Sequence, residues 1–257
     1  MSLLTHDVVD AVAVLRINDP RRRNIISLPL VTELEEALDR IEADPRMRAV
    51  VVTGEPPAFC AGADLADLEA ASNGDGAGLQ RIYQGFLRVA NCSLPTIAAV
   101  NGPAVGAGMN LALACDIRMA GESAVFDTRF MNLGLHPGGG HTWMLQRAVG
   151  YQSACAILLC SESLDGRAAA ERNLAWQCVH DEDLLEQSVA LAQRAGKVPL
   201  ELLRRTKESL RASSAGQGHA ESVEHEYQQQ LWSVQQEEFQ NFLTKMKQRI
   251  SGQGKKT

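Results

Sequence analysis

The chain has 257 residues, a hydrophobic share of 45% and a formal net charge of −6. This length suits one large domain, or a domain with an appendage, that buries its core without help from metals or disulfides. The acidic balance gives no reason to expect a nucleic acid or an anionic membrane as a partner.

The N-terminal part reads as an alternation of strands and helices. Residues 8–17 form a β-branched run typical of a strand or hairpin, and Ser27 starts a helix with one apolar face. A buried strand is predicted at residues 49–53, followed by helices over residues 64–71 and 79–91.

The middle of the chain continues this alternation. Residues 96–100 are β-branched and apolar, a further strand is predicted around residues 117–120, and residues 107–114 between them have helical character. Strands that alternate with short helices favour an α/β fold.

Strand patterns disappear after about Leu184. Two amphipathic helices are predicted there, over residues 201–211 and 221–250, both rich in Gln and Glu. We therefore divide the chain into an α/β core, residues 1–195, and a helical region, residues 196–257.

The cysteines and the N-terminus bear on the compartment. Six cysteines are scattered without a C-x-x-C pair, as expected for buried thiols in a reducing environment. The first residues lack the basic and apolar segments of a secretory leader, and no apolar run reaches membrane-spanning length. We expect a cytoplasmic protein.

Two turns built from small residues stand out. Residues 59–64, Phe-Cys-Ala-Gly-Ala-Asp, follow the strand at 49–53, and residues 101–108, Asn-Gly-Pro-Ala-Val-Gly-Ala-Gly, follow the strand at 96–100. Glycine and alanine let a ligand approach the main chain closely. Free amides at two such turns can point at one oxygen, which is how an oxyanion hole is built.

Together these segments resemble the crotonase superfamily, the enoyl-CoA hydratase/isomerase family. The resemblance continues through Cys115-Asp116, residues 134–140 and residues 147–150 and covers nearly the whole chain. It implies a spiral of ββα units that holds the CoA-thioester site, and a C-terminal helical region that forms a homotrimer or a hexamer. The alternative for those helices is a lid packed on its own core.

The resemblance also implies an acyl-CoA ligand, with coenzyme A as part of the substrate and no tightly bound cofactor. It assigns the two amide donors to Ala61 and Ala107. Such donors stabilise the enolate that forms when a thioester loses a proton from its α-carbon, and each is typically worth about 3–4 kcal/mol in the transition state.

The acidic groups of the family are missing. Family hydratases carry glutamates at two positions that fall on Asn110 and Phe130 here, and other members carry a polar residue where Gly138 stands. Neither an amide nor a phenyl ring takes up a proton near neutral pH. We therefore expect little 2-enoyl-CoA hydration. His136, in the loop before Gly138, is a candidate substitute.

Two functions stay open. One is an enzyme that stabilises a thioester enolate and uses a proton relay without carboxylates; the other is a noncatalytic acyl-CoA binding protein. The pair His136 and His141 lacks the i, i+4 spacing of helical metal ligands, so we expect no metal site.

Coenzyme A contacts are carried over from the same resemblance. The adenosine and 3′-phosphate are expected near a Pro-containing turn, where guanidinium groups pair well with phosphate, although solvated arginines on a turn are the alternative. Tyr83 and Gln84 are candidates to contact the acyl chain. The expected substrate-binding residues are Arg22, Arg23, Asn24, Ala63, Asp64, Leu65, Gly106 and Gly138.

Overall fold

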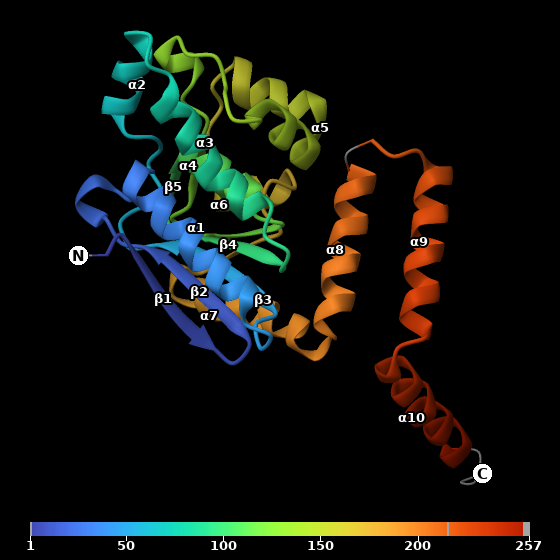
Figure 1. Ribbon diagram of the computed structural model, residues 1–257. Helices are drawn as coiled ribbons and strands as arrows, with labels where there is room; N and C mark the ends of the chain where they lie inside the picture. The colour runs from blue at the N-terminus through green and yellow to red at the C-terminus, as the bar shows by residue number, and fades with distance from the viewer. Residues whose placement is uncertain (1, 215, 254–257) are drawn as a thin grey trace. The chain divides into compact units, whose positions relative to one another are not determined.

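The computed structural model describes residues 2–214 and 216–253. The chain divides into two compact units, one that ends at Gly196 and one that begins at Lys197 (Figure 1). The first unit contains all the β-structure of the described residues, and the second unit is helical.

The first unit alternates strands with helices. Its strands are β1 Leu4–Val9, β2 Val12–Ile17, β3 Ala49–Gly54, β4 Thr96–Val100, β5 Pro103–Val105, β6 Ile117–Gly121, β7 Val125–Asp127, β8 Leu164–Asp165 and β9 Gln177–Val179. Its α-helices are α1 Leu28–Ala43, α2 Leu65–Ser72, α3 Ala77–Ala90, α4 Ala107–Ala114, α5 His141–Leu159, α6 Gly166–Glu171 and α7 Leu184–Gln193. Short 3₁₀ turns are η1 Pro20–Arg22, η2 Met131–Leu133, η3 Asp181–Asp183 and, where the units join, η4 Arg194–Lys197.

The strands form two sheets. The large sheet has the order β1-β2-β3-β4-β6-β9, with β1 antiparallel to β2 and every other pair parallel. The small sheet has the order β5-β7-β8. Parallel neighbours need crossover connections, which explains why helices separate the central strands.

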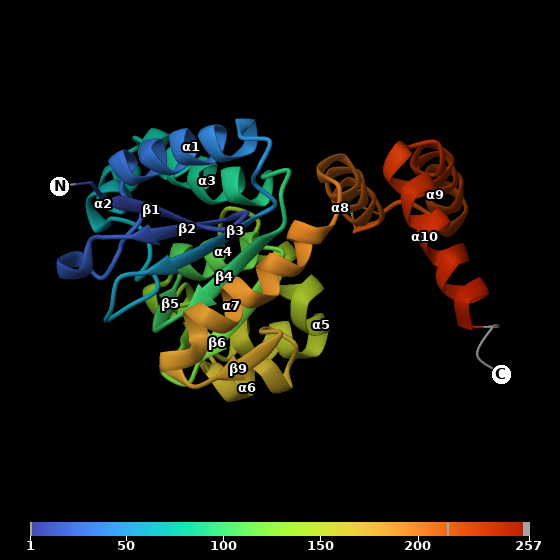
Figure 2. The ribbon, with the colours of Figure 1, turned by 90° about the horizontal axis from the view of Figure 1, so that it is seen from below.

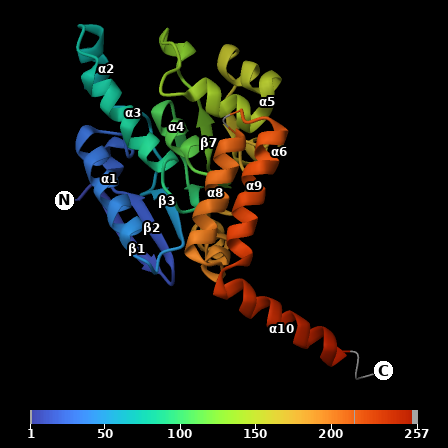
Figure 3. The same ribbon diagram turned by 45° about the vertical axis from the view of Figure 1, so that its right-hand side comes forward.

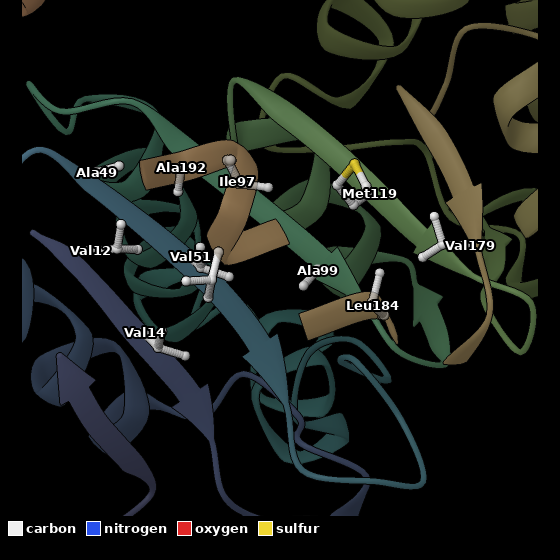
Figure 4. Packing of buried hydrophobic residues seen from close by; sticks show 11 residues of the cluster. Val12, Val14, Ala49, Val51, Ile97, Ala99, Met119, Val179, Leu184 and Ala192 are labelled. Carbon is white, nitrogen blue, oxygen red and sulfur yellow. The ribbon is translucent and has the colours of Figure 1, made fainter. Parts of the chain in front are cut away.

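Both faces of the central strands β2, β3 and β4 are covered, so these strands are buried along nearly their whole length, whereas the edge strand β1 is exposed after its first residue. Helix α7 packs on one face, against Val12, Val14, Val51 and their neighbours on the same face (Figure 4). Helices α1 and α3 lie on the opposite face (Figure 2). This arrangement leaves the carboxyl ends of β3 and β4 free to carry functional loops.

Most predicted elements of this unit are confirmed. The run at residues 8–17 is a hairpin, and Asp10 takes the left-handed conformation at its turn with a φ of 54°. The predicted helix from Ser27 and the predicted strand from Ala49 match α1 and β3. The short strand β5 lies inside a segment that was expected to be a loop.

The second unit contains α8 Leu200–Ser214, α9 His219–Val234 and α10 Glu237–Gln253. The predicted single helix over 221–250 is wrong, because the chain breaks between α9 and α10. The side-chain amides of Gln236 and Gln240 donate to the carbonyls of Trp232 and Val234, each at 2.8 Å, and so satisfy the end of α9. No Gly or Pro marks this break in the sequence.

Helices α8 and α9 lie side by side (Figure 3). The guanidinium of Arg205 stacks on the ring of Trp232, 4.1 Å from its centroid, and donates to Gln229 at 2.9 Å. Within the described residues, no helix combines the length and the apolar character needed to cross a membrane.

Candidate active site

The two small-residue loops are joined by main-chain hydrogen bonds. The amide of Cys60 donates to the carbonyl of Pro103 at 3.0 Å, and the amide of Val105 donates to the carbonyl of Cys60 at 3.0 Å. Cys60 thereby pairs with Ala104 as an isolated parallel bridge. The loop after β3 and the turn before α4 therefore form one connected structure.

Glycine makes this close approach possible. A Cβ atom added to Gly108 would lie 1.9 Å from the carbonyl oxygen of Cys60. Gly62 and Gly106 have φ values of +112° and +53°, in the region that L side chains rarely adopt. The small-residue pattern thus reflects both backbone conformation and backbone contact.

The amide predicted as the first oxyanion donor is already engaged. Ala61 donates to the carbonyl of Arg23 at 3.0 Å, so the assignment to Ala61 is corrected. The bridge between Ile26 and Ala63 uses the carbonyl of Gly62 and the amide of Asp64. Ala63 lies between these two bonding residues, and in a parallel bridge such a residue directs its own amide away from the partner segment.

The amides at this junction that have no acceptor within the described chain include those of Ala63 and Ala107, which come from different loops. Ala107 is the first residue of α4, where helical amides lack an intrahelical partner. A Cβ built on Gly62, the neighbour of Ala63, would lie 4.0 Å from the Ala107 nitrogen. The main chain of both loops therefore meets at one place, with free donors on both sides.

These amides border a cavity of about 120 Å³. Most of its lining is apolar and includes Leu65, Leu68, Ile82 and Phe130. The lining side chains with polar atoms are Tyr83, Asn110, Thr128, Arg129 and His136. Within the described residues, no aspartate or glutamate lines this cavity.

Asn110 is held from both ends. Its Nδ2 donates to the carbonyl of Gly138 at 3.0 Å, and its Oδ1 is hydrogen-bonded to Nδ1 of His141. Because an amide oxygen only accepts, Nδ1 of His141 carries the proton. Burial lowers the pKa of His141 to about 4, so the imidazole is neutral near pH 7. Its Nε2 atom is buried and has no partner among the described residues.

Phe130 packs on the same histidine. The two rings meet edge to face with their centroids 4.9 Å apart. The positions of both missing glutamates, Asn110 and Phe130, are therefore linked through His141. No local sequence pattern indicates this link, because Asn110 and His141 lie 31 positions apart in the chain.

His136 lies on the exposed side of the cavity. Its Nδ1 lies 2.7 Å from the carbonyl oxygen of Pro137, and because a carbonyl only accepts, Nδ1 carries the proton of this bond. Arg129 forms an ion pair with Asp127 at 2.5 Å, and this bond raises the pKa of Arg129. No group of three or more potential metal ligands occurs in residues 2–214 and 216–253.

Comparison with known proteins identifies the family. Residues 7–253 match the family described as enoyl-CoA hydratase/isomerase. The chain belongs to this family, within the crotonase superfamily.

Individual relatives of this enoyl-CoA hydratase/isomerase family agree in sequence and fold. A Mycobacterium tuberculosis protein named "probable enoyl-CoA hydratase EchA14" is 48% identical over 86% of this chain and 85% of its own length. The 1,2-epoxyphenylacetyl-CoA isomerase of Escherichia coli is 36% identical over 77% and 78% of the two chains. The crystal structure of enoyl-CoA hydratase from Bacillus anthracis matches with a TM-score of 0.89 and 27% identity, covering 96% of each chain.

The turn expected to contact coenzyme A has mixed roles in this chain. Arg22 is exposed and pairs with Asp19 at 2.8 Å and Asp64 at 3.1 Å. Arg23 is exposed and has a φ of 54°, and its carbonyl receives the Ala61 amide. Both guanidinium groups thus stay at the surface, where a phosphate can reach them.

Asn24 is different, and its predicted contact with the ligand is wrong. Its side chain is fully buried and donates to the carbonyls of Glu55 and Ala58, each at 2.7 Å. Its Oδ1 accepts from the amide of Asp19 at 2.9 Å. All these partners lie in the protein, so Asn24 holds the turn in place.

The other substrate-binding candidates divide into two groups. Ala63, Leu65, Gly106 and Gly138 line the cavity. Asp64 instead caps α2 by accepting from the amide of Ala66 at 3.1 Å. Tyr83 lines the cavity as well, whereas Gln84 accepts from Arg81 at 3.1 Å and does not border the cavity.

Proposed function

We propose that the chain is an acyl-CoA thioester enzyme that stabilises an enolate with the amides of Ala63 and Ala107. The observation that carries this proposal is the pair of uncommitted amides at one cavity. Two preorganised donors favour the oxyanion over the uncharged carbonyl, because they need no reorientation when the charge develops. The family membership supports a coenzyme A thioester as the source of that carbonyl.

The lining of the cavity argues against ordinary 2-enoyl-CoA hydration. Hydration needs one group that activates water and one that gives a proton to the α-carbon, and losing such a group costs about two to four decades in rate. Asn110 has its oxygen committed to His141, and Phe130 has no polar atom. We assign the role of base to Nε2 of His136, which favours proton transfer within the acyl chain over addition of water.

Binding of the coenzyme is assigned to the surface of the first unit. Arg22 and Arg23 are the proposed partners of the phosphates, and Leu65 borders the entrance with an exposed side chain. For the helical region, residues 196–257, we propose the homotrimer or dimer of trimers that the family resemblance implies. Coenzyme A enters with the substrate, and no separate tightly bound cofactor is part of the proposal.

A second candidate is a noncatalytic acyl-CoA binding protein. The observation that favours it is the full commitment of Asn110, whose oxygen and nitrogen both bond to the protein. In this case the cavity would bind a thioester, and its α-protons would not exchange with solvent.

Deuterium exchange distinguishes the two candidates. The purified protein is incubated in D₂O with butyryl-CoA and with trans-3-hexenoyl-CoA, and deuterium in the acyl group is followed by mass spectrometry. Thermal denaturation is recorded with the same thioesters, since a ligand that binds the folded state raises the melting temperature. Exchange with stabilisation supports the enzyme, and stabilisation without exchange supports the binding protein. Absence of both overturns both.

A further inference from the structure

Tyr83 occupies space that another residue leaves empty. It lies on α3 and borders the cavity beside Gly138. A Cβ atom built on Gly138 would lie 2.1 Å from the Tyr83 hydroxyl oxygen and 2.9 Å from its Cζ. The hydroxyl therefore fills the volume that any side chain at position 138 would need.

The ring of Tyr83 is held while its hydroxyl is not. The ring packs on Phe86, with the centroids 5.8 Å apart, and on Gly139, where an added Cβ would lie 3.1 Å from the Tyr83 Cδ1. In the described part of the chain, the Tyr83 hydroxyl has no hydrogen-bond partner. A fixed ring thus presents an uncommitted O–H group at the wall of the cavity.

The other polar groups of the wall are committed or unsuited to giving a proton. Arg129 is paired with Asp127, and its guanidinium keeps its protons at any physiological pH. Thr128 is directed to the carbonyl of Ile157 at 3.5 Å, and Asn110 bonds at both ends. His136 is assigned to the role of base rather than of proton donor. Among the described residues of this wall, Tyr83 thus has a neutral O–H group with no hydrogen-bond acceptor, whereas the Thr128 hydroxyl is directed to a carbonyl.

We propose that Tyr83 is a catalytic residue, the proton donor of the reaction, and that its hydroxyl takes the place of the side chain that residue 138 lacks. The inference rests on the proposed function, because it needs the enolate held by Ala63 and Ala107. Burial raises the pKa of Tyr83, which keeps the hydroxyl protonated through neutral pH.

The step balances for a 3-enoyl thioester. Nε2 of His136 removes a proton from C2, and the C–H electron pair becomes the dienolate whose oxygen is held by the two amides. The dienolate then forms a new C–H bond at C4 with the proton of the Tyr83 hydroxyl, the double bond moves to C2–C3, and the C=O bond is restored. The tyrosinate regains a proton from the His136 imidazolium through water, so no external reactant is consumed.

The test follows deuterium at two carbons separately. Wild type, Tyr83→Phe and Tyr151→Phe are incubated with trans-3-hexenoyl-CoA in D₂O, and label at C2 and C4 is measured by NMR. Tyr151, the control, lies on α5 and is 73% exposed. We expect Tyr83→Phe to keep the thermal stabilisation by the thioester and the exchange at C2, and to lose C4 labelling by about 100-fold or more. The control is expected to match wild type.

A swap tests the shared volume. Gly138→Asp alone collides with the Tyr83 hydroxyl, whereas Tyr83→Leu together with Gly138→Asp has room for the new side chain. We expect the double variant to label C4 at least about tenfold faster than Tyr83→Leu, since a carboxyl group then stands where the hydroxyl was.

The failures of the two proposals are distinguishable. Wild-type C4 labelling in Tyr83→Phe overturns the role of Tyr83 and leaves the proposed function intact. Exchange at C2 in wild type without label at C4 does the same. Loss of thermal stabilisation in Tyr83→Phe, together with both labels, indicates a packing role and also overturns the inference. A wild type that neither binds nor exchanges overturns the proposed function itself.

Discussion

Replacing Gly108 by alanine tests the junction on which the paired amides depend. The added Cβ would lie 1.9 Å from the carbonyl oxygen of Cys60 and 2.7 Å from its carbonyl carbon. Ordinary contact begins at 3.4 Å, so the two main-chain segments must separate by about 1.5 Å, the difference between 3.4 and 1.9 Å. Both obstructing atoms are backbone, which cannot rotate away as a side chain does.

The separation acts directly on the two donors. Ala107 precedes Gly108, and Ala63 belongs to the loop that Cys60 ties down, so the amides move apart with their loops. A misplacement of about 1 Å can cost roughly 100-fold in rate, and we expect at least this loss in thioester exchange. Overpacking adds a loss of stability of about 1–3 kcal/mol.

The assay combines urea denaturation with deuterium exchange of butyryl-CoA at a temperature where the variant is folded. Gly76→Ala is the matched control, because Gly76 has a φ of −82° and a Cβ there meets nothing within 4 Å. If the folded Gly108→Ala variant exchanged deuterium at the wild-type rate, the reasoning would be refuted, because the rate would then not depend on the distance between the two amides.

Three further changes test individual residues. Ala107→Pro removes an amide hydrogen at the first position of α4, where proline is tolerated. We expect turnover to fall by a factor of about 10²–10³, while circular dichroism shows that the helices remain folded. Ala77→Pro, at the same position of α3, is the control and should have little effect on turnover. Burial lowers the pKa of His141 from 6.5 to about 4, so between these pH values the unfolded chain binds a proton that the folded chain does not. The free energy of unfolding should therefore decrease by about 3 kcal/mol as the pH is lowered from 6.5 to 4. His141→Gln should flatten this part of the pH dependence of urea denaturation, and an unchanged slope would contradict the assignment. Asn24→Ala should lower the free energy of unfolding by about 2–3 kcal/mol, because it leaves buried main-chain groups without hydrogen-bond partners. Calorimetry on the folded variant should give a coenzyme A affinity close to that of the exposed control Asn132→Ala. A large loss of affinity would support the predicted contact of Asn24 with the ligand.

Local periodicity was enough to predict the elements that bury a continuous face. Helix α1 and strand β3 followed from apolar spacing, because each buries side chains at a regular interval. Strands β8 and β9 were missed because they contain two and three residues, too few for a pattern. They exist only because distant strands offer hydrogen-bond partners.

The site was predicted at the level of its loops and not of its atoms. Ala61 and Ala63 have the same side chain, and only the pairing of Ala63 with Ile26 decides which amide is free. The contact of Asn110 with His141 joins residues 31 positions apart, which no local pattern reveals. Asn24 looked like a ligand contact because burial cannot be read from a polar turn.

The main-chain bonds that join Cys60 to Pro103 and Val105 also bear on how a thioester arrives. Binding loops commonly lose conformational entropy when a ligand orders them, and that loss weakens affinity. Here the main-chain bonds between the two loops order them before the thioester binds, so binding should cost little further conformational entropy of these loops. In hydrogen-exchange experiments on the free protein, the amides of Cys60 and Val105 should then be protected like those of the sheet rather than like those of a flexible loop.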